Sequence, residues 1–192
     1  MIKIKRPQCP NQSALFSGNY KHADNKSVLI EANFDKCMYC ESKVSHVYFG
    51  DIEHIKPKKL FPELEFDWGN LGFACAKCNG SKKDNYDAKT PCVDPYLEAP
   101  DNFLIALGPF IKHKQGSERG EYTIKIIDLN RAQLIEKRLH RLTQIEKAID
   151  ACFRTQNEEL RKAALAELLI EAHQDKEYSL IVRSLFIQHK LI

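Results

Sequence analysis

The chain has 192 residues, enough for one domain with additions or for a small domain joined to a helical extension. Its content of 43% hydrophobic and 29% charged residues is typical of a soluble globular protein, and its apolar runs are too short to span a membrane. A formal net charge of +3 excludes a strong overall field for polyanions, so any affinity for nucleic acid must come from local clusters or from a partner. The basic N-terminus lacks the apolar stretch of a secretory signal, which predicts a cytoplasmic protein with reduced thiols.

The first elements expected in chain order are short. A weak helical pattern lies around residues 27–34. From residue 37 to 95, glycines, prolines and cysteines break the chain into small pieces. Within this region SHVYFGDIEHI (45–55) predicts two brief strands joined near Gly50, and NLGFACAKCNGSKKD (70–84) predicts a strand, a cysteine knuckle and a helix.

The later elements have clearer periodicity. EYTIKIIDL (121–129) alternates as a strand does, with Tyr122, Ile124 and Ile126 on one face. Helical spacing begins near residue 130 and predicts a first helix with an apolar stripe, a second helix at about 157–173 and a third at about 176–189. The stripe of the first helix comprises Leu134, Ile135, Leu139, Leu142, Ile145 and Ile149. These stripes indicate core packing or a partner interface, and nothing on them requires chemistry.

Seven cysteines in a reducing compartment need a role, and four of them form two Cys-x-x-Cys pairs. Two such pairs complete a tetrahedral site with four protein ligands and no open position, which predicts a structural Zn²⁺ ion. Redox chemistry and four simply buried thiols are the alternatives. The pairs are Cys37/Cys40 and Cys75/Cys78. The isolated Cys9, Cys92 and Cys152 are interpreted as small buried hydrophobic residues.

The segment between the two cysteine pairs carries residues whose side chains can act in catalysis. Glu53 and His54 are adjacent, so in a regular strand their side chains would point to opposite faces. Pro57 disfavours continued strand pairing, so we expect the strand to end or bulge where both side chains can act together. The metal-bound Cys78 fixes the backbone of Asn79, which shares a helix face with Lys83 through i, i+4 spacing.

The strings CMYC, DIEHIKP and WGNLGFACAKCNGSKKD, in this order, resemble the HNH (His-Me finger) endonucleases. The resemblance implies an α+β fold, in which a small ββα-metal core is stapled by a zinc knuckle and followed by a mainly helical C-terminal extension. It places the nuclease core at residues 37–95. An N-terminal arm at 1–36 would pack on this core, and a strand and helices at 96–192 would bind a partner.

The resemblance also implies roles for single residues. The general base of the family falls on His54, and the carboxylate that binds the catalytic Mg²⁺ falls on Glu53. The asparagine that braces the loop carrying the base falls on Asn70. The last metal-ligand position falls on Asn79, so Glu53 and Asn79 together would hold Mg²⁺, with Mn²⁺ as a substitute.

Some members of the family carry a histidine four residues after the last ligand, and this chain has Lys83 there. Lys83 and its neighbour Lys82 are therefore interpreted as phosphate contacts, and Lys56, Lys58 and Lys59 would extend the basic track. The role of Asp51 stays open between orienting His54 and capping a turn. We expect structural roles for Trp68 and Asp94, and surface or packing positions for His46 and His113.

Within the family, the likeness is greatest to the HNH nucleases of Septu and retron-associated anti-phage systems. It is carried by CMYCE, GDIEHIKPKKLFPELEFDWGNL, CNGSKKD, VDPY and IDLNR. The likeness implies an endonuclease that serves as effector of a defence complex with an ABC-type ATPase and prefers DNA, with RNA possible. The alternative is a zinc-stabilised module that binds nucleic acid or protein through a degenerate site, which the intact Glu53, His54 and Asn79 disfavour.

Overall fold

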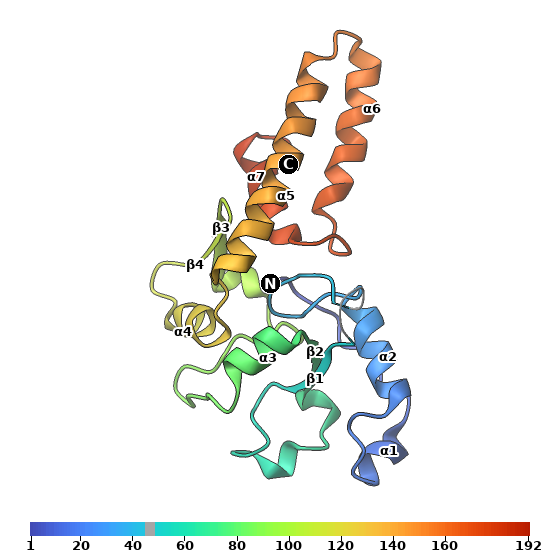
Figure 1. Ribbon diagram of the computed structural model, residues 1–192, viewed down its shortest axis with the longest axis vertical. Coiled ribbons are helices and arrows are strands. Elements are labelled where there is room, and N and C mark those ends of the chain that lie inside the picture. The colour runs from blue at the N-terminus through green and yellow to red at the C-terminus, as the bar shows by residue number, and fades with distance from the viewer. Residues whose placement is uncertain (45–48) are drawn as a thin grey trace.

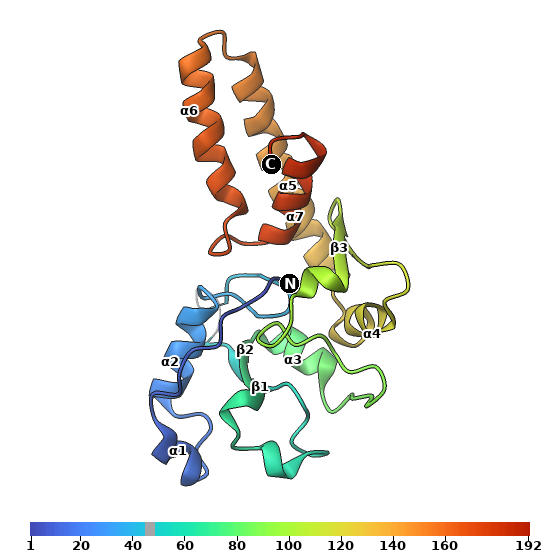
Figure 2. The ribbon, with the colours of Figure 1, turned by 180° about the vertical axis from the view of Figure 1, so that it is seen from behind.

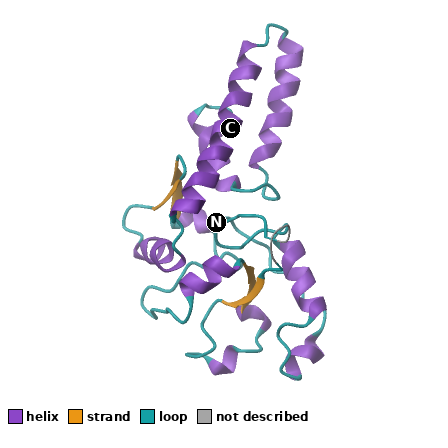
Figure 3. Ribbon diagram, viewed as in Figure 1, coloured by secondary structure: helices purple, strands orange, loops and turns teal. Residues whose placement is uncertain are grey.

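The computed structural model describes residues 1–44 and 49–192. The first of the two strands expected within 45–55, and with it His46, therefore lies outside the described residues. The chain forms two parts (Figures 1 and 2). One holds the N-terminal helices and a small sheet with its helix, and the other is a helical hairpin that extends away from it. Figure 3 shows how little strand the molecule contains.

The N-terminal arm contains two helices, α1 (Gln12–Phe16) and α2 (Ala23–Ala32), and α2 packs against the small sheet. The buried Asn25 joins the two helices, because its amide donates to the carbonyl of Asn11 and accepts from the amide of the same residue, both at 3.0 Å. Helix α2 begins earlier than the pattern around 27–34 indicates, since the His22 side chain accepts a hydrogen bond from Asp24 N and caps it there.

The small sheet pairs β1 (Asp51–His54) with β2 (Leu71–Ala74) in antiparallel register, and α3 (Ala76–Lys82) packs beside β1. Two single-turn 3₁₀ helices, η1 (Pro62–Leu64) and η2 (Trp68–Asn70), interrupt the loop between the strands. Gly50 precedes β1 with φ +63°, and a Cβ there would lie 2.2 Å from the ring of Phe73. Only glycine allows the backbone at residue 50 to pack this closely against the Phe73 ring, and this contact holds the start of β1 on the core.

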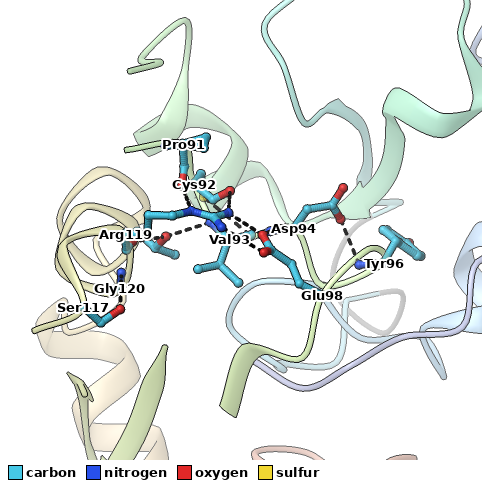
Figure 4. A network of polar contacts seen from close by, with 10 residues as sticks. Pro91, Cys92, Val93, Asp94, Tyr96, Glu98, Ser117, Arg119 and Gly120 are labelled. Atoms are coloured by element: carbon cyan, nitrogen blue, oxygen red, sulfur yellow. Dashed lines mark hydrogen bonds and ion pairs between the residues drawn. The ribbon is translucent and has the colours of Figure 1, made fainter. Parts of the chain in front are cut away.

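The middle of the chain forms a second hairpin, β3 (Leu104–Leu107) and β4 (Phe110–His113), preceded by η3 (Pro100–Asn102). Figure 4 shows Arg119, from the helix that follows this hairpin, donating to the carbonyl of Pro91 and to the carboxylate of Glu98, which lie on either side of the VDPY segment. The Asp94 side chain accepts from Tyr96 N at 2.8 Å, which is the structural role expected for it.

The strand expected at EYTIKIIDL is wrong, because residues Glu118–Ile127 form the helix α4. Ser117 caps the helix by accepting from Gly120 N, and Glu118 in the first turn and Lys125 in the last turn complement the helix dipole. The buried residues Gly120, Thr123 and Ile127 follow helical spacing. The β-branched residues imitate a strand locally, and the capping residues decide the outcome.

The C-terminal part follows the predicted helices as α5 (Ala132–Arg154), α6 (Glu158–Leu169), the short η4 (Ile170–Ala172) and α7 (Ser179–Gln188). One position of the α5 stripe is wrong: Leu139 is 54% exposed, and Arg138 is buried beside it. Arg138 is held inside because its guanidinium donates to the carbonyl of Leu129 at 2.7 Å. None of the helices in the described part of the chain is long and apolar enough to cross a membrane.

A buried polar contact joins the two parts of the molecule. The Glu41 carboxylate, next to the first cysteine pair, accepts from Ser179 Oγ at 2.7 Å and lies 2.6 Å from the amino group of Met1. Burial alone would raise the pKa of Glu41, but the amino group of Met1 and the nearby Lys36 lower it to about 2. Glu41 is therefore charged at neutral pH and anchors the start of α7 on the small core.

Candidate active site

The four paired cysteines form one cluster, whose sulfur atoms all lie within 4.8 Å of one another. The sulfurs of Cys40 and Cys75 are 3.9 Å apart, and four bonds of roughly 2.3 Å in a tetrahedron would place them about 3.8 Å apart. Met38 N donates to Phe73 O, so the first knuckle is fixed to β2. The cluster fits one metal ion with four sulfur ligands, which leaves no open position for water.

Arg131, the residue before α5, contacts the same cluster. Its two terminal nitrogens lie 3.5 Å from Cys78 Sγ. Burial lowers the pKa of Arg131 and the neighbouring cysteine sulfurs raise it, with a net rise. A guanidinium in this position stabilises negative charge on sulfur. The IDLNR segment thus connects the helical part directly to the cysteine cluster.

His54 is the last residue of β1 and lies opposite Leu71 of β2. Its Nε2 is 3.0 Å from the carbonyl oxygen of Glu65, and since a carbonyl only accepts, Nε2 carries the proton. Nδ1 then keeps a lone pair that can take a proton. Burial lowers the pKa of His54 below its ordinary value, so the imidazole is neutral at pH 7 and suited to act as a base.

Asn70 lies where the resemblance places the brace of the loop. Its side-chain oxygen accepts from Lys56 N at 2.7 Å, and its amide donates to Lys56 O at 2.9 Å and to Leu64 O at 3.1 Å. The loop that follows His54 is therefore pinned at both ends by one buried side chain. Trp68 anchors the same loop on the N-terminal arm, because its indole N–H donates to Pro7 O at 2.9 Å.

Glu53 is buried, 3% exposed, and its carboxylate is held by two groups. Lys82 Nζ lies 2.7 Å from Oε1, and the Tyr39 hydroxyl lies 3.3 Å from the same oxygen. Burial raises the pKa of Glu53, and Lys82 opposes that rise. Because both contacts fall on Oε1, the carboxylate is oriented with Oε2 left for another ligand.

The expected phosphate contact of Lys82 is not what the structure contains. Its side chain is 1% exposed, and its ammonium group donates to the carboxylate of Glu53 and, at 2.8 Å, to the carbonyl of His54. Lys82 is drawn inward because a buried carboxylate needs a buried cation. Its neighbour Lys83 is exposed and closes α3 with φ +48°, so of this pair only Lys83 has its ammonium group open to solvent.

Asn79, in the middle of α3, contacts Asp51, the first residue of β1. Asn79 Nδ2 donates to Asp51 Oδ2 at 3.1 Å, which leaves Asn79 Oδ1 as an acceptor with a fixed orientation. Asp51 therefore orients the metal-ligand candidate Asn79 across the gap between β1 and α3. The structure thus gives Asp51 a contact with Asn79, a role beside the two that the sequence left open.

A cleft of about 510 Å³ brings the candidate residues together. Asp51, Glu53, His54 and Asn79 line it, and so does Lys83. Asn70 and Lys82 support it from behind. The lining further includes Tyr20, Lys21, Lys26, Phe49, Lys58 and Asp84. Of the expected basic track, Lys58 therefore lies at the cleft.

Three residues of the site are not part of any motif that the sequence analysis identified. Tyr20 comes from the N-terminal arm and packs edge-on against His54, with ring centroids 4.7 Å apart. Tyr39 lies inside the CMYC string, where only the cysteines drew attention. Lys26 reaches the carbonyl of Gly50 at 2.9 Å from α2. Tyr20 and Lys26 join the site only when the arm is folded on the core, and Tyr39 joins it only when the CMYC string packs against Glu53.

A larger cavity of about 670 Å³ lies elsewhere, between the first residues of the chain and α2. It is lined by Arg6, Asn33 and Lys36 among others, and by none of the residues grouped around His54. The described residues that line it include no histidine that could act as a general base. The smaller cleft is therefore the candidate site on chemical grounds.

The comparisons with known proteins agree with this geometry. A family model of the HNH endonucleases matches residues 37–85, which include both cysteine pairs and the cleft residues of β1 and α3. Residues 37–85 are therefore identified as an HNH domain. It is 27% identical to the Septu protein PtuB of Bacillus thuringiensis, over 99% of this chain and 83% of that protein. It is 31% identical to the Septu protein PtuB of Bacillus mycoides, over 66% of this chain and 54% of that protein.

The predicted α+β HNH fold with its cysteine cluster and helical C-terminal part is thus confirmed, and so is the likeness to the HNH proteins of Septu systems. The match to the first PtuB protein extends through the helical part.

Proposed function

We propose that this HNH protein is a metal-dependent endonuclease that hydrolyses phosphodiester bonds, DNA by preference, as the effector of a Septu-type defence complex. The observation that carries the proposal is the neutral, buried imidazole of His54, beside Glu53 and Asn79 in one cleft. Zn²⁺ is the ion proposed for the cysteine cluster, because four sulfurs and no open position match a structural zinc site.

The donor set of the cleft fits a hard divalent cation. Glu53 Oε2 and Asn79 Oδ1 are both oxygen ligands, and each is oriented by a partner on its other atom. Few protein ligands suit Mg²⁺, which keeps several of its waters, and Mn²⁺ accepts the same set. Bound there, the ion would supply positive charge at the scissile phosphate and at the leaving oxygen.

The residues of the chain supply the proton transfer and the positioning. His54 Nδ1 takes a proton from the attacking water. The imidazolium that forms is stabilised because its Nε2–H already donates to the Glu65 carbonyl. Lys83 and Lys58 hold neighbouring phosphates by charge. Attack in line with the leaving 3′ oxygen gives 5′-phosphate and 3′-hydroxyl ends.

The partner proposed for the complex is an ABC-type ATPase, and its contact surface is the helical part. The support is the likeness to Septu proteins along that part, together with exposed apolar residues there, Phe153 and Leu160 among them. Co-purification of the ATPase with the intact chain, and its loss when Phe153 and Leu160 are both changed to serine, is the expected result. Retention of the ATPase by that variant would place the contact elsewhere.

The nuclease proposal is tested by cleavage of plasmid DNA with Mg²⁺, in the presence and absence of the ATPase. His54→Ala is expected to lower the rate at least about 100-fold, because general-base catalysis contributes on that order. His113→Ala is the matched control, since His113 is exposed on β4 and does not line the cleft. Equal cutting by the His54 and His113 variants would contradict the proposal and favour a binding module.

A further inference from the structure

The wall of the cleft nearest His54 is aromatic. The Tyr20 ring packs edge-on against the imidazole and lies 6.2 Å from the ring of Phe66. Phe49 lines the same cleft and is 84% exposed, and Phe66 is 40% exposed. Exposed aromatic rings are costly in water unless a ligand or partner covers them. Here Tyr20 and Phe49 line the cleft that holds the candidate base, and Phe66 extends the aromatic surface beside Tyr20.

Cations alternate with these rings. The ammonium groups of Lys58 and Lys21 lie 5.0 Å and 5.6 Å from the centroid of the Tyr20 ring. Lys26 and Lys83 line the cleft as well. The acidic groups of the cleft are Asp51 and Glu53, which are held by Asn79 and Lys82, and Asp84 near the exposed Lys59. Rings beside cations form the surface that single-stranded nucleic acid recognises, with bases on the rings and phosphates on the cations.

The depth of the site favours the same kind of ligand. His54 is 8% exposed, with the carbonyl of Glu65 on one side and the Tyr20 ring on the other. A phosphate must enter a recess to reach Nδ1. An unpaired strand bends into a recess at low cost, whereas a duplex must first be opened or unstacked, at a few kcal/mol for each base.

We propose that the cleft binds nucleic acid as an unpaired strand, with bases stacked on Tyr20, Phe49 and Phe66 beside the scissile phosphate. This inference rests on the proposed nuclease function and names its substrate class: DNA or RNA at single-stranded or unpaired positions. It also gives the N-terminal arm a role, because Tyr20, Lys21 and Lys26 bring the arm to the substrate.

Binding is measured with the full-length His54→Ala chain in Mg²⁺-free buffer, so that no cleavage occurs. The probes are a 12-nucleotide single strand, its duplex, and a duplex with one unpaired base, each in DNA and RNA and each carrying 2-aminopurine. Stacking of the probe base on a ring is read from quenching of its fluorescence. We expect the single strand to bind at least about tenfold more tightly than the duplex, since each stacked base contributes on that order.

The decisive variants change the ring and keep the charge. Phe49→Ala is expected to weaken single-strand binding about tenfold and to reduce the quenching, and Phe49→Trp is expected to restore both. Phe110→Ala is the matched control, because Phe110 is 42% exposed on β4 and does not line the cleft. Lys83→Met is expected to weaken all probes alike and to lower the salt dependence of binding.

Three results would overturn the inference: equal affinity for single strand and duplex, equal loss for both probes in Phe49→Ala, or no binding of any probe. The nuclease proposal fails by a different measurement, the cleavage assay, in which the His54 and His113 variants would cut alike. A single-strand preference without His54-dependent cleavage would keep the inference on the cleft and refute the reaction.

Discussion

The small core and the helical part are stabilised by different means. The core has strands of only four residues, and its loops are held by buried polar side chains such as Asn70 and Lys82 and by the cysteine cluster. The helical part is held by apolar residues repeated along α5, α6 and α7. In the core each contact is therefore needed, while in the helices the stabilisation is spread over many similar contacts. Substitutions in the core should therefore affect both stability and cleavage, and substitutions in the helical part should affect stability alone.

The largest difference should follow removal of the metal from the core. Cys78→Ser, or chelation, is expected to unfold the β1–β2–α3 region, because structural zinc contributes about 10 kcal/mol or more to folding. Cys92→Ser is the matched control, since Cys92 is buried outside the cluster. Metal content and protection from hydrogen exchange report the result, with α5 and α6 expected to stay more protected than α3. A variant that binds no metal and keeps α3 fully protected would contradict the role of the cluster.

The next effect concerns a single polar contact in the core. Lys82→Met leaves the Glu53 carboxylate buried without its cation, so its pKa rises further and it binds a divalent cation poorly. We expect a loss of about 3 kcal/mol in stability and at least about 100-fold in cleavage. Excess Mg²⁺ should recover part of the activity, and Lys82→Arg more of it.

The control for Lys82 is Lys83→Met, which removes the same charge from the exposed neighbour. Its cleavage rate should fall less than about tenfold, and its unfolding temperature should stay unchanged. Equal stability losses at the two positions would mean that the pair with Glu53 does not stabilise the core.

A change in the helical part should reduce stability and leave the chemistry intact. Leu142→Ala removes a side chain that is 5% exposed, and we expect a cost of about 3 kcal/mol. Leu139→Ala, one turn away on the exposed side, should cost about 0.5 kcal/mol or less. Below the unfolding temperature, the specific cleavage rate of both variants should equal that of the wild type. A drop in that rate for Leu142→Ala alone would show that the two parts are not separable in this way.

The smallest effect is a shift in the pH profile. Since burial lowers the pKa of His54, its neutral form persists to lower pH, and the acid limb of cleavage should have its midpoint below pH about 6.5. In Lys82→Met the protonation of Glu53 should move the acid limb to higher pH, while Leu142→Ala should leave it in place. A midpoint above pH 7 in the wild type would contradict the assignment of His54 as base.

Much of the core could be predicted because its signals are chemical. Cysteine spacing, the Glu53-His54 pair and Pro57 each allow few local structures, and β1 does end at His54. Other features depend on tertiary contacts that no local pattern carries. Lys82 and Lys83 are identical in sequence terms, and only the buried Glu53 draws one of them inward.

The helical part shows the same division. The periodicity predicted the helix α5 and most of its apolar stripe, but the inward position of Arg138 depends on a carbonyl nine residues earlier in the chain. The strand expected at 121–129 was wrong because alternating isoleucines were given more weight than the Ser117 cap. The hairpin of β3 and β4 has a signal in the sequence, the Gly108-Pro109 turn between two apolar segments.

The contact of Arg131 with Cys78 gives α5 the mechanics of a lever. The helix has 23 residues, so its free end lies about 35 Å from the sulfur that its first turn adjoins. A tilt of about 5° at that pivot displaces the far tip by about 3 Å, roughly the rise of two residues. A partner that pushed on the tip would exert a larger force at the pivot, which is the cysteine cluster. Asn79 directly follows Cys78 of that cluster. The longest helix among the described residues is in this way attached at its N-terminal end to the cysteine cluster.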